Sequence, residues 1–321
     1  MKRPLLIAEC CQNHNGDREV LARMVDEAAA AGADLVKLQA IRSADLVFRE
    51  RFEPDAVDED GHRAAILRPY EQERARLAGL DLDEDDERFF VERCAAAGVQ
   101  PMITLFTRFV ADHYRELGFT WAKIASYDCR SVPLLREAAA AFDDVVVSTG
   151  ASFDDEVDRA VGVFVEGQLS LLHAVTIYPT GLEDLHLARM RWLRQRCSSV
   201  GFSDHTAPAV TGLRASKLAL ALGADVVERH FTVLPPDATR DGPVSVDPAG
   251  LAELRRFADL RPEERMVAIE EEWSDWQVGL GEQQRRLTEA ELANRDYYSG
   301  RFAARVDGRI VDNWVEESTS S

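Results

Sequence analysis

The stretch that decides the fold is Ala31-Gly32-Ala33-Asp34-Leu35-Val36-Lys37-Leu38-Gln39, in which a helix-like pattern gives way to a short apolar run. Glycine after the last helical turn supplies the left-handed backbone that ends a helix before the chain reverses. The same signal recurs at Leu222-Gly223-Ala224-Asp225, directly before the apolar run of residues 226–230. A helix followed by a strand is therefore a repeated unit of this chain.

The alternation along the chain predicts an α/β fold with a parallel sheet. Helix-like segments separate the apolar runs, as is typical of strands joined by helical crossovers. Eight runs within roughly 250 residues are the expected content of a (β/α)₈ TIM barrel, and an open, doubly wound sheet is the competing architecture. We expect a catalytic barrel domain over residues 1–260. The runs are residues 5–9, 35–39, 101–105, 121–125, 145–148, 169–173, 200–203 and 226–230.

Two segments interrupt this alternation. Residues 41–83 form a long charged connection after the second run, expected as a structureless loop at the mouth of the barrel. Residues 261–321 form a short C-terminal extension, in which a helical stretch precedes a hairpin signal at Asp307-Gly308. We expect residues 316–321 to be frayed.

Composition and charge restrict the possible partners. A formal net charge of −19 argues against nucleic acid and anionic membranes, because both repel such a protein. The sequence has neither a membrane-spanning apolar run nor a signal peptide, so we expect a soluble, cytoplasmic protein. The odd number of cysteines, five, favours free thiols, with Cys10-Cys11 in a packing role. An anionic small substrate stays possible if cations gather locally.

The ends of the predicted strands carry the candidate chemistry, because catalytic groups of TIM barrels lie at the C-terminal strand ends. Every predicted strand ends in polar or ionisable residues: Glu9, Lys37 with Gln39, Thr104, Lys123 with Ser126, Ser148 with Thr149, His173, Ser203-Asp204-His205, and Glu228 with His230. Two lysines, three histidines and two glutamates are thus expected at one end of the barrel. This set predicts an active site there.

The lysines and hydroxyl groups suit an anionic substrate. Lys37 and Lys123, with Ser126, Ser148 and Ser203, form a candidate cradle for a phosphate and a carboxylate. The alternative is that both lysines are ordinary surface residues, since buried lysine is rare unless it is paired.

The histidines and carboxylates suit a metal ion. His205 and His230 follow adjacent predicted strands, so both imidazoles are candidate ligands of one divalent cation. Glu9 and Asp128 add carboxylates that can orient a metal-bound water or move protons. A histidine pair alone is more often structural, so this signal is weak without further support.

Other functions are compatible with the same residues. Lys37 or Lys123 is a candidate Schiff-base nucleophile of a pyruvate-type aldolase, which needs a desolvated lysine with a lowered pKa. Cys10 or Cys129 with His173 is a weaker candidate for a thiol nucleophile. A third hypothesis is a barrel without catalysis that serves as a binding or assembly subunit.

Several motifs of the predicted barrel form one recognisable set, and with them the chain resembles the sialic acid synthase family. This family includes N-acetylneuraminate, legionaminate and pseudaminate synthases, and the resemblance covers residues 4–260. The motifs are Ile7-Ala8-Glu9, Asn13-His14-Asn15-Gly16-Asp17, Lys37-Leu38-Gln39, Lys123-Ile124-Ala125-Ser126, Ser148-Thr149-Gly150, Leu171-Leu172-His173, Tyr178-Pro179-Thr180, Gly201-Phe202-Ser203-Asp204-His205-Thr206 and Glu228-Arg229-His230-Phe231-Thr232.

The resemblance implies condensation of phosphoenolpyruvate with an aldose or related aldehyde, giving a 2-keto-3-deoxy sugar acid and phosphate. It implies a divalent metal (Mn²⁺, Mg²⁺ or Co²⁺) held by His205 and His230, which polarises the aldehyde. Glu9 would orient water, while Asp128 and Tyr178 would face the acceptor. The remaining substrate-binding positions that the resemblance implies are Lys37, Gln39, Thr104, Lys123, Ser126, Ser148 and Ser203.

The departures from the family pattern concern the acceptor. Typical members carry a C-terminal antifreeze-like domain that contributes an arginine across a homodimer, and the segment after Leu260 is too short for it. Thr176 stands where N-acetylneuraminate synthases have an asparagine that contacts the acceptor, and Ala174 replaces a cysteine. Arg240 is a candidate for replacing the missing arginine in cis. We therefore expect a homodimer that binds phosphoenolpyruvate and a small aldehyde or sugar, with N-acetylmannosamine disfavoured as the acceptor.

Overall fold

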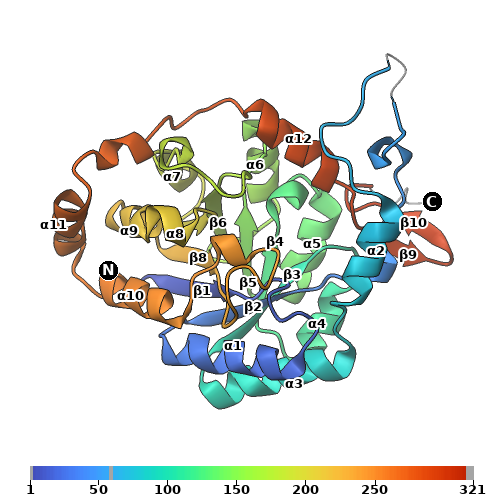
Figure 1. Cartoon of the computed structure of the whole chain (residues 1–321), viewed down its shortest axis with the longest axis horizontal. Helices are drawn as coiled ribbons and strands as arrows, with labels where there is room; N and C mark the ends of the chain where they lie inside the picture. Colours follow the sequence, from blue (N-terminus) through green and yellow to red (C-terminus); the bar gives the residue numbers. More distant parts are fainter. Residues whose placement is uncertain (1–2, 58–60, 316–321) are drawn as a thin grey trace.

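Eight parallel strands close into a barrel in the computed structural model, which describes residues 3–57 and 61–315 (Figure 1). β1 pairs with both β2 and β8, and this closure confirms the predicted TIM barrel and excludes the open sheet. The strands are β1 (Leu5–Glu9), β2 (Leu35–Gln39), β3 (Gln100–Leu105), β4 (Trp121–Ile124), β5 (Asp144–Ser148), β6 (Leu169–Ala174), β7 (Ser199–Asp204) and β8 (Val226–His230).

Helices surround the barrel and bury its outer face. In α1, Leu21, Met24 and Val25 lie on one buried stripe, and Asp17 caps the first turn by accepting hydrogen bonds from two backbone N–H groups. The surrounding helices are α1 (Arg18–Ala30), α3 (Glu84–Ala97), α4 (Ala111–Leu117), α5 (Val132–Ala141), α6 (Asp154–Val161), α7 (Arg189–Arg194), α8 (Pro208–Thr211), α9 (Arg214–Ala221) and α10 (Pro248–Ala258).

An apolar layer fills the inside of the barrel beneath the candidate site. It consists of Ile7, Leu35, Met102, Val146, Leu172 and Val226, all nearly inaccessible to solvent. Side chains two positions apart on a strand point to the same face, so the next inward-pointing residues form a second layer. That second layer contains Glu9, Lys37, Thr104, Ser148 and Glu228. The two-residue period of the strands therefore places polar side chains directly above a buried apolar layer.

The connection over residues 41–83 has more structure than the sequence predicted. It contains two 3₁₀ turns, η1 (Ser43–Asp45) and η2 (Glu50–Phe52), and the helix α2 (Tyr70–Ala78). Leu46 and Leu77 pack with Phe302 of the C-terminal extension in a small separate core. The expectation of a structureless loop was wrong because contacts with a distant segment, absent from any local pattern, stabilise the turn and helix.

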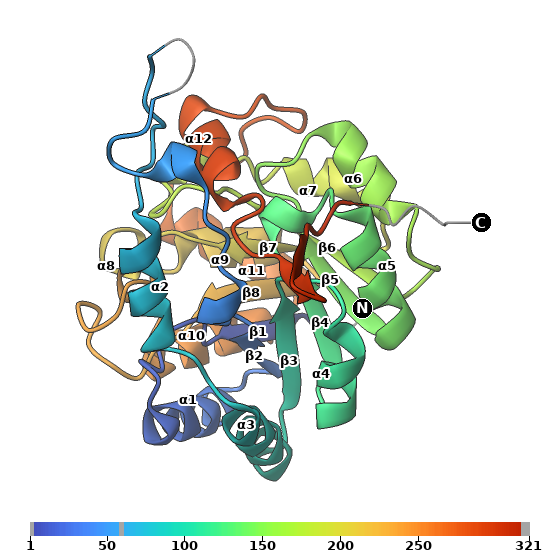
Figure 2. The ribbon, with the colours of Figure 1, turned by 90° about the vertical axis from the view of Figure 1, so that its right-hand side faces the viewer.

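The C-terminal extension returns to the end of the barrel at which the connection over residues 41–83 lies. It contains α11 (Pro262–Glu272), η6 (Trp276–Gly279), α12 (Glu289–Tyr298) and a hairpin of β9 (Ala304–Val306) and β10 (Arg309–Val311). The predicted hairpin is confirmed, and Asp307 and Gly308 both have positive φ in its turn. α12 lies beside the loop before α2 in both ribbon views (Figure 2), where the Phe52 and Tyr297 rings meet at 5.1 Å.

The domain boundary at residue 260 stays a prediction, and the expected fraying of residues 316–321 lies outside the described residues. Within residues 3–57 and 61–315, no helix is both long and apolar enough to cross a membrane.

Gly201 of β7 is required by the close packing of the barrel wall. A Cβ at this position would lie 1.9 Å from the carbonyl oxygen of Val226. Because backbone of the neighbouring strand cannot yield, we expect Gly201→Ala to lower the free energy of unfolding by more than about 3 kcal/mol in urea denaturation. Gly162→Ala is the control, since its Cβ would meet nothing closer than 3.5 Å. Equal effects of the two substitutions would contradict this steric explanation.

Candidate active site

The strand register brings the predicted residues into neighbouring positions. Glu9 lies opposite Lys37 on one side and opposite His230 on the other. On neighbouring strands, Ser203 of β7 lies opposite Glu228 of β8, and Thr104 of β3 lies opposite Lys123 of β4. Closure of the sheet thus gathers residues that are separated by most of the chain.

A network of buried charges occupies the polar layer. The carboxylate of Glu228 accepts from Lys37 Nζ at 2.8 Å, from Lys123 Nζ at 3.0 Å and from Ser203 Oγ at 2.7 Å. Lys37 also pairs with Glu9. The side chains of both lysines are at most 4% exposed, so the alternative that they are surface residues is wrong.

The two lysines respond differently to this network. Burial lowers the pKa of Lys37, but the carboxylates of Glu228 and Glu9 outweigh burial and raise it above the ordinary value. Burial, with the charge of Lys37, lowers the pKa of Lys123 to about 8, because Glu228 offsets it only in part. Burial alone would raise the pKa of Glu228, yet Lys123 and Lys37 hold it well below its usual range. Glu228 therefore stays ionised.

Several polar atoms of the site have no hydrogen-bond partner among the described residues. Among them are Thr104 Oγ1, Ser148 Oγ, Thr176 Oγ1 and His230 Nδ1, and all are buried. Buried polar groups are nearly always satisfied in native proteins, so each exception needs an explanation. Thr104, Ser148 and Thr176 are also residues that the sequence assigned to substrate binding.

His205 is held in one orientation and kept neutral. Its Nδ1 lies 2.8 Å from the carbonyl oxygen of Val175, so Nδ1–H donates and Nε2 is left with its lone pair. Nε2 lies 3.2 Å from the hydroxyl of Tyr178. Burial, together with the nearby His230 ring, lowers the pKa of His205 to about 3. The two imidazole rings have centroids 5.4 Å apart.

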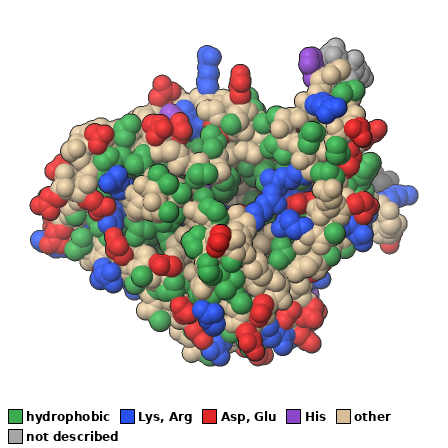
Figure 3. Space-filling model, in the orientation of Figure 1, with side chains coloured by type: hydrophobic (Ala, Val, Ile, Leu, Met, Phe, Trp, Pro, Cys, Tyr) green, Lys and Arg blue, Asp and Glu red, His purple; other side chains and the backbone are tan. Residues whose placement is uncertain are grey.

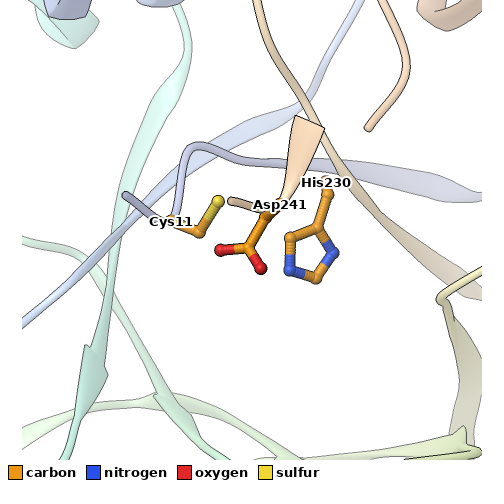
Figure 4. Close-up of side chains that lie close together, drawn as sticks. All are labelled: Cys11, His230 and Asp241. Carbon is orange, nitrogen blue, oxygen red and sulfur yellow. The ribbon is translucent and has the colours of Figure 1, made fainter. Parts of the chain in front are cut away.

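His230 belongs to a second cluster that the sequence reasoning missed. Ligand atoms of Cys11, His230 and Asp241 lie within 4.8 Å of one another, and Figure 4 shows their side chains pointing toward a common space. Cys11 was interpreted as packing, and burial does raise its thiol pKa, so the thiol is protonated. Asp241 lies in the loop after β8, where sequence reasoning singled out only Arg240. Only the short distance between Asp241 and His230 in the folded chain identifies Asp241 as a member of this cluster, because no sequence spacing indicates it.

Asp128 connects the barrel to the C-terminal extension. Its Oδ1 accepts from Asn313 Nδ2 at 2.9 Å and from Ser131 Oγ at 3.1 Å. Burial raises its pKa to about 6, although these hydrogen bonds work in the opposite direction. Next to it, the ring of Tyr127 stacks on Tyr298 of α12 at 4.8 Å. Asn313 and Tyr298 had no signal in the sequence because they follow the predicted barrel.

A cavity of about 410 Å³ opens above the buried charges. Five of the predicted residues line it, namely Gln39, Asp128, Tyr178, His230 and Arg240, whereas the lysines lie deeper in the barrel. The other lining residues are Gln12, Ile41, Arg68, Arg76, Phe106, Ala125, Tyr127, Asp241, Asn294, Tyr298, Gly300, Arg301 and Phe302. His173 lies apart from this cavity, with its Nε2 2.7 Å from the carbonyl oxygen of Leu185.

The fold and this site define a barrel synthase, and comparisons with known proteins identify the family. Residues 24–263 match the model of the NeuB family, and the chain belongs to this family. It is 30% identical over 260 residues to N,N'-diacetyllegionaminic acid synthase of Legionella pneumophila, covering 78% of this chain and 69% of that protein. Pseudaminic acid synthase of Campylobacter jejuni is 26% identical and covers 100% of this chain and 87% of its own length.

A solved structure supports the same assignment. The sialic acid synthetase of Leptospira borgpetersenii, crystallised with citrate, superimposes with a TM-score of 0.69 at 26% identity, over 92% of this chain and 91% of that one. The resemblance to sialic acid synthases is thus confirmed. The chain is an enzyme of the class that condenses phosphoenolpyruvate with a sugar, forming a C–C bond, and synthases of this family depend on a metal.

A fully buried ion pair fixes the ends of β7 and β8, from which both histidines extend. Asp204 Oδ1 lies 2.7 Å from Arg229 Nη1, with both side chains 0% exposed. Arg229 also donates to the carbonyl oxygens of Thr206 and Val244. The pair therefore ties together the loops that follow the two strands.

Breaking this pair should be costly. We expect Asp204→Asn to lower the free energy of unfolding by about 3–5 kcal/mol, because it leaves the Arg229 charge buried without a counterion. Asp158→Asn, which removes an exposed ion pair with Arg196, should cost less than about 1 kcal/mol. Urea denaturation of both variants tests the difference, and similar losses would sink the assignment.

Proposed function

We propose that this synthase binds phosphoenolpyruvate in the polar layer of the barrel and an open-chain aldehyde in the cavity above it. The observation that carries the proposal is the set of buried, unpartnered polar atoms beside two charged lysines. Such atoms cost free energy until a ligand bonds to them. Their position at the C-terminal strand ends is where barrel enzymes hold their substrates.

Phosphoenolpyruvate suits this layer because it is a small, compact anion. Lys37 and Lys123 supply ammonium donors, and the hydroxyls of Thr104 and Ser148 supply further hydrogen bonds. Glu9 and Glu228 keep the lysines charged inside the barrel, where burial alone would favour the neutral amine. The other proposed contacts to this substrate are Ser126, Ser203 and Gln39, all at strand ends around the layer.

The residues present fit a divalent metal. His205 is neutral and directs Nε2 away from its Val175 bond, and His230 Nδ1 is buried with no partner among the described residues. Asp241 offers a carboxylate oxygen beside His230. We propose His205 and His230 as ligands of Mn²⁺, Mg²⁺ or Co²⁺, with Asp241 in reach. A metal bound there supplies Lewis acidity to the acceptor carbonyl.

The remaining residues orient the attacking water and the acceptor. C3 of phosphoenolpyruvate forms the new bond to the aldehyde carbon, water adds at C2, and C–O cleavage releases phosphate from the tetrahedral intermediate. Glu9 orients that water from the edge of the polar layer. Asp128 and Tyr178 contact the acceptor, since both line the cavity. Thr176 lies beside them, where its carbonyl accepts from Asn294. A cytoplasmic homodimer is proposed from the resemblance alone.

Lys123 should control the alkaline side of the pH profile. Its pKa of about 8 means that its charge is lost as pH rises through that value. We expect kcat/KM for phosphoenolpyruvate to fall above about pH 8 in the wild type. In Lys123→Arg the guanidinium keeps its charge, so the decline should move to higher pH whatever the absolute activity. Unchanged profiles in the two proteins would show that another group controls this limb.

His230 should be needed for metal binding but not for folding. We expect His230→Ala to lose Mn²⁺ binding in equilibrium dialysis and to lower metal-dependent phosphate release at least about 100-fold, with a wild-type circular dichroism spectrum. His113→Ala, on α4 at the outer helix ring, is the control and should keep both properties. Normal Mn²⁺ binding by the His230 variant would overturn the ligand assignment.

One observation favours the aldolase alternative enough to test it. A pKa of about 8 makes Lys123 a better Schiff-base nucleophile than an ordinary lysine. However, its Nζ is engaged by Glu228 at 3.0 Å, and we expect no covalent adduct with pyruvate. Borohydride treatment in the presence of pyruvate, followed by mass spectrometry, distinguishes the aldolase from the phosphoenolpyruvate-dependent synthase. A reduced adduct on Lys123 would favour the aldolase.

A further inference from the structure

Four arginines gather on one wall of the cavity, and we name Arg68, Arg76, Arg240 and Arg301 the arginine wall. They come from three separate segments: the connection before and within α2, the loop after β8, and the link between α12 and β9 in the C-terminal extension. Figure 3 shows basic side chains gathered at the edge of a hollow on this face. In a chain with a net charge of −19, such a concentration of cations inside a cavity requires a reason.

A single carboxylate holds much of this wall together. Glu73 accepts from Arg76 at 2.9 Å and from Arg240 at 3.4 Å, and it also pairs with Arg301. One negative charge therefore faces three guanidinium groups. The wall carries an excess of positive charge even before Arg68 is counted.

The guanidinium groups also have spare donors. Arg68 Nη1 and Arg301 Nε are buried, and the described part of the chain offers neither of them a hydrogen-bond partner. Arg68 rests over the rings of Tyr297 and Tyr298 at 4.9 and 5.4 Å, which fixes its plane against α12. Preordered, unpaired guanidinium donors suit the oxygens of a phosphate or carboxylate.

The acidic residues of the cavity lie beside other partners. Asp241 sits with Cys11 and His230, and Asp128 accepts from Asn313 and Ser131. A neutral sugar would bring no charge to the arginine wall. An acceptor with an anionic group would use the wall, while its aldehyde lies near His230.

We propose that the acceptor aldehyde carries an anionic group, a phosphate or a carboxylate, which binds to the arginine wall. This inference rests on the proposed function, because it assigns one end of the acceptor in the same site. The C-terminal extension then contributes Arg301 to the acceptor from within the same chain.

Matched acceptor pairs test the proposal on the full-length enzyme with phosphoenolpyruvate and Mn²⁺. The pairs are D-arabinose 5-phosphate with D-arabinose, N-acetylmannosamine 6-phosphate with N-acetylmannosamine, and D-glucuronate with D-glucose. We expect the anionic member of at least one pair to have about 100-fold higher kcat/KM, as expected for two or more charge-assisted hydrogen bonds. The phosphate and carboxylate pairs distinguish the two anions. Equal kcat/KM within every pair that turns over would overturn the inference while leaving the synthase function intact.

A binding measurement covers the case in which no pair turns over, an outcome that would count against the proposed function. Isothermal titration calorimetry compares each sugar phosphate or uronate with its neutral partner. Tighter binding of the anionic member, lost in Arg68→Gln, supports the inference. Equal binding of both members overturns it.

Variants locate the anion on the wall. Arg68→Gln and Arg301→Gln should each raise KM for the anionic acceptor about 10-fold and leave KM for phosphoenolpyruvate unchanged. Arg68 is the safer variant, because Arg301 also pairs with the buried Glu73. Arg309→Gln, exposed on β10 of the same extension, is the control and should change neither constant. A rise in KM for phosphoenolpyruvate instead would assign the wall to that substrate and contradict the proposal.

Discussion

The carboxylate of Glu228, buried between Lys37 and Lys123, is the interaction on which the rest of the site depends. Ammonium groups inside a barrel lose their hydration, so without a carboxylate nearby they would give up their protons. Glu228 and Glu9 prevent this for Lys37 and limit it for Lys123. The network is possible only because the barrel closes, since β8 must return to the edge of β1 to place Glu228 and Glu9 on the same side of the sheet.

The layered interior explains why this charged network is tolerated. The apolar layer below it excludes water from the barrel axis, and the inward positions two residues later carry the charges. The lysines and glutamates of the layer pair with one another, whereas the hydroxyls of Thr104 and Ser148 have no hydrogen-bond partner among the described residues. A folded protein accepts such a layer at a functional site because the binding of substrate satisfies the groups that folding leaves unpaired.

The cavity above this layer is built by segments that a barrel alone does not require. The connection over residues 41–83 and the C-terminal extension meet through Leu46, Leu77 and Phe302. The connection supplies two arginines to the wall and the extension supplies one. The barrel and the added segments have different roles in the proposed site. In the proposed function, the strand ends of the barrel hold the groups that act on the reacting atoms, whereas the added segments line the cavity for the acceptor. This agrees with a family in which the chemistry is shared and the named sugar products differ.

The sequence by itself determined the barrel and most of its polar layer. Regular alternation of helix and strand signals is a local property, and the two-residue period of each strand fixes which side chains point inward. Glu9, Lys37, Lys123, His205 and His230 were therefore predictable as residues of strand ends. Only the tertiary structure decided that Glu228 pairs with both lysines, that Asp241 and Cys11 lie beside His230, and that Asn313 reaches Asp128. These contacts join segments far apart in the chain, and their geometry depends on loop paths and packing that no local pattern encodes. The arginine wall is of the same kind, because its members become neighbours only when α2, the loop after β8 and the extension converge over the barrel.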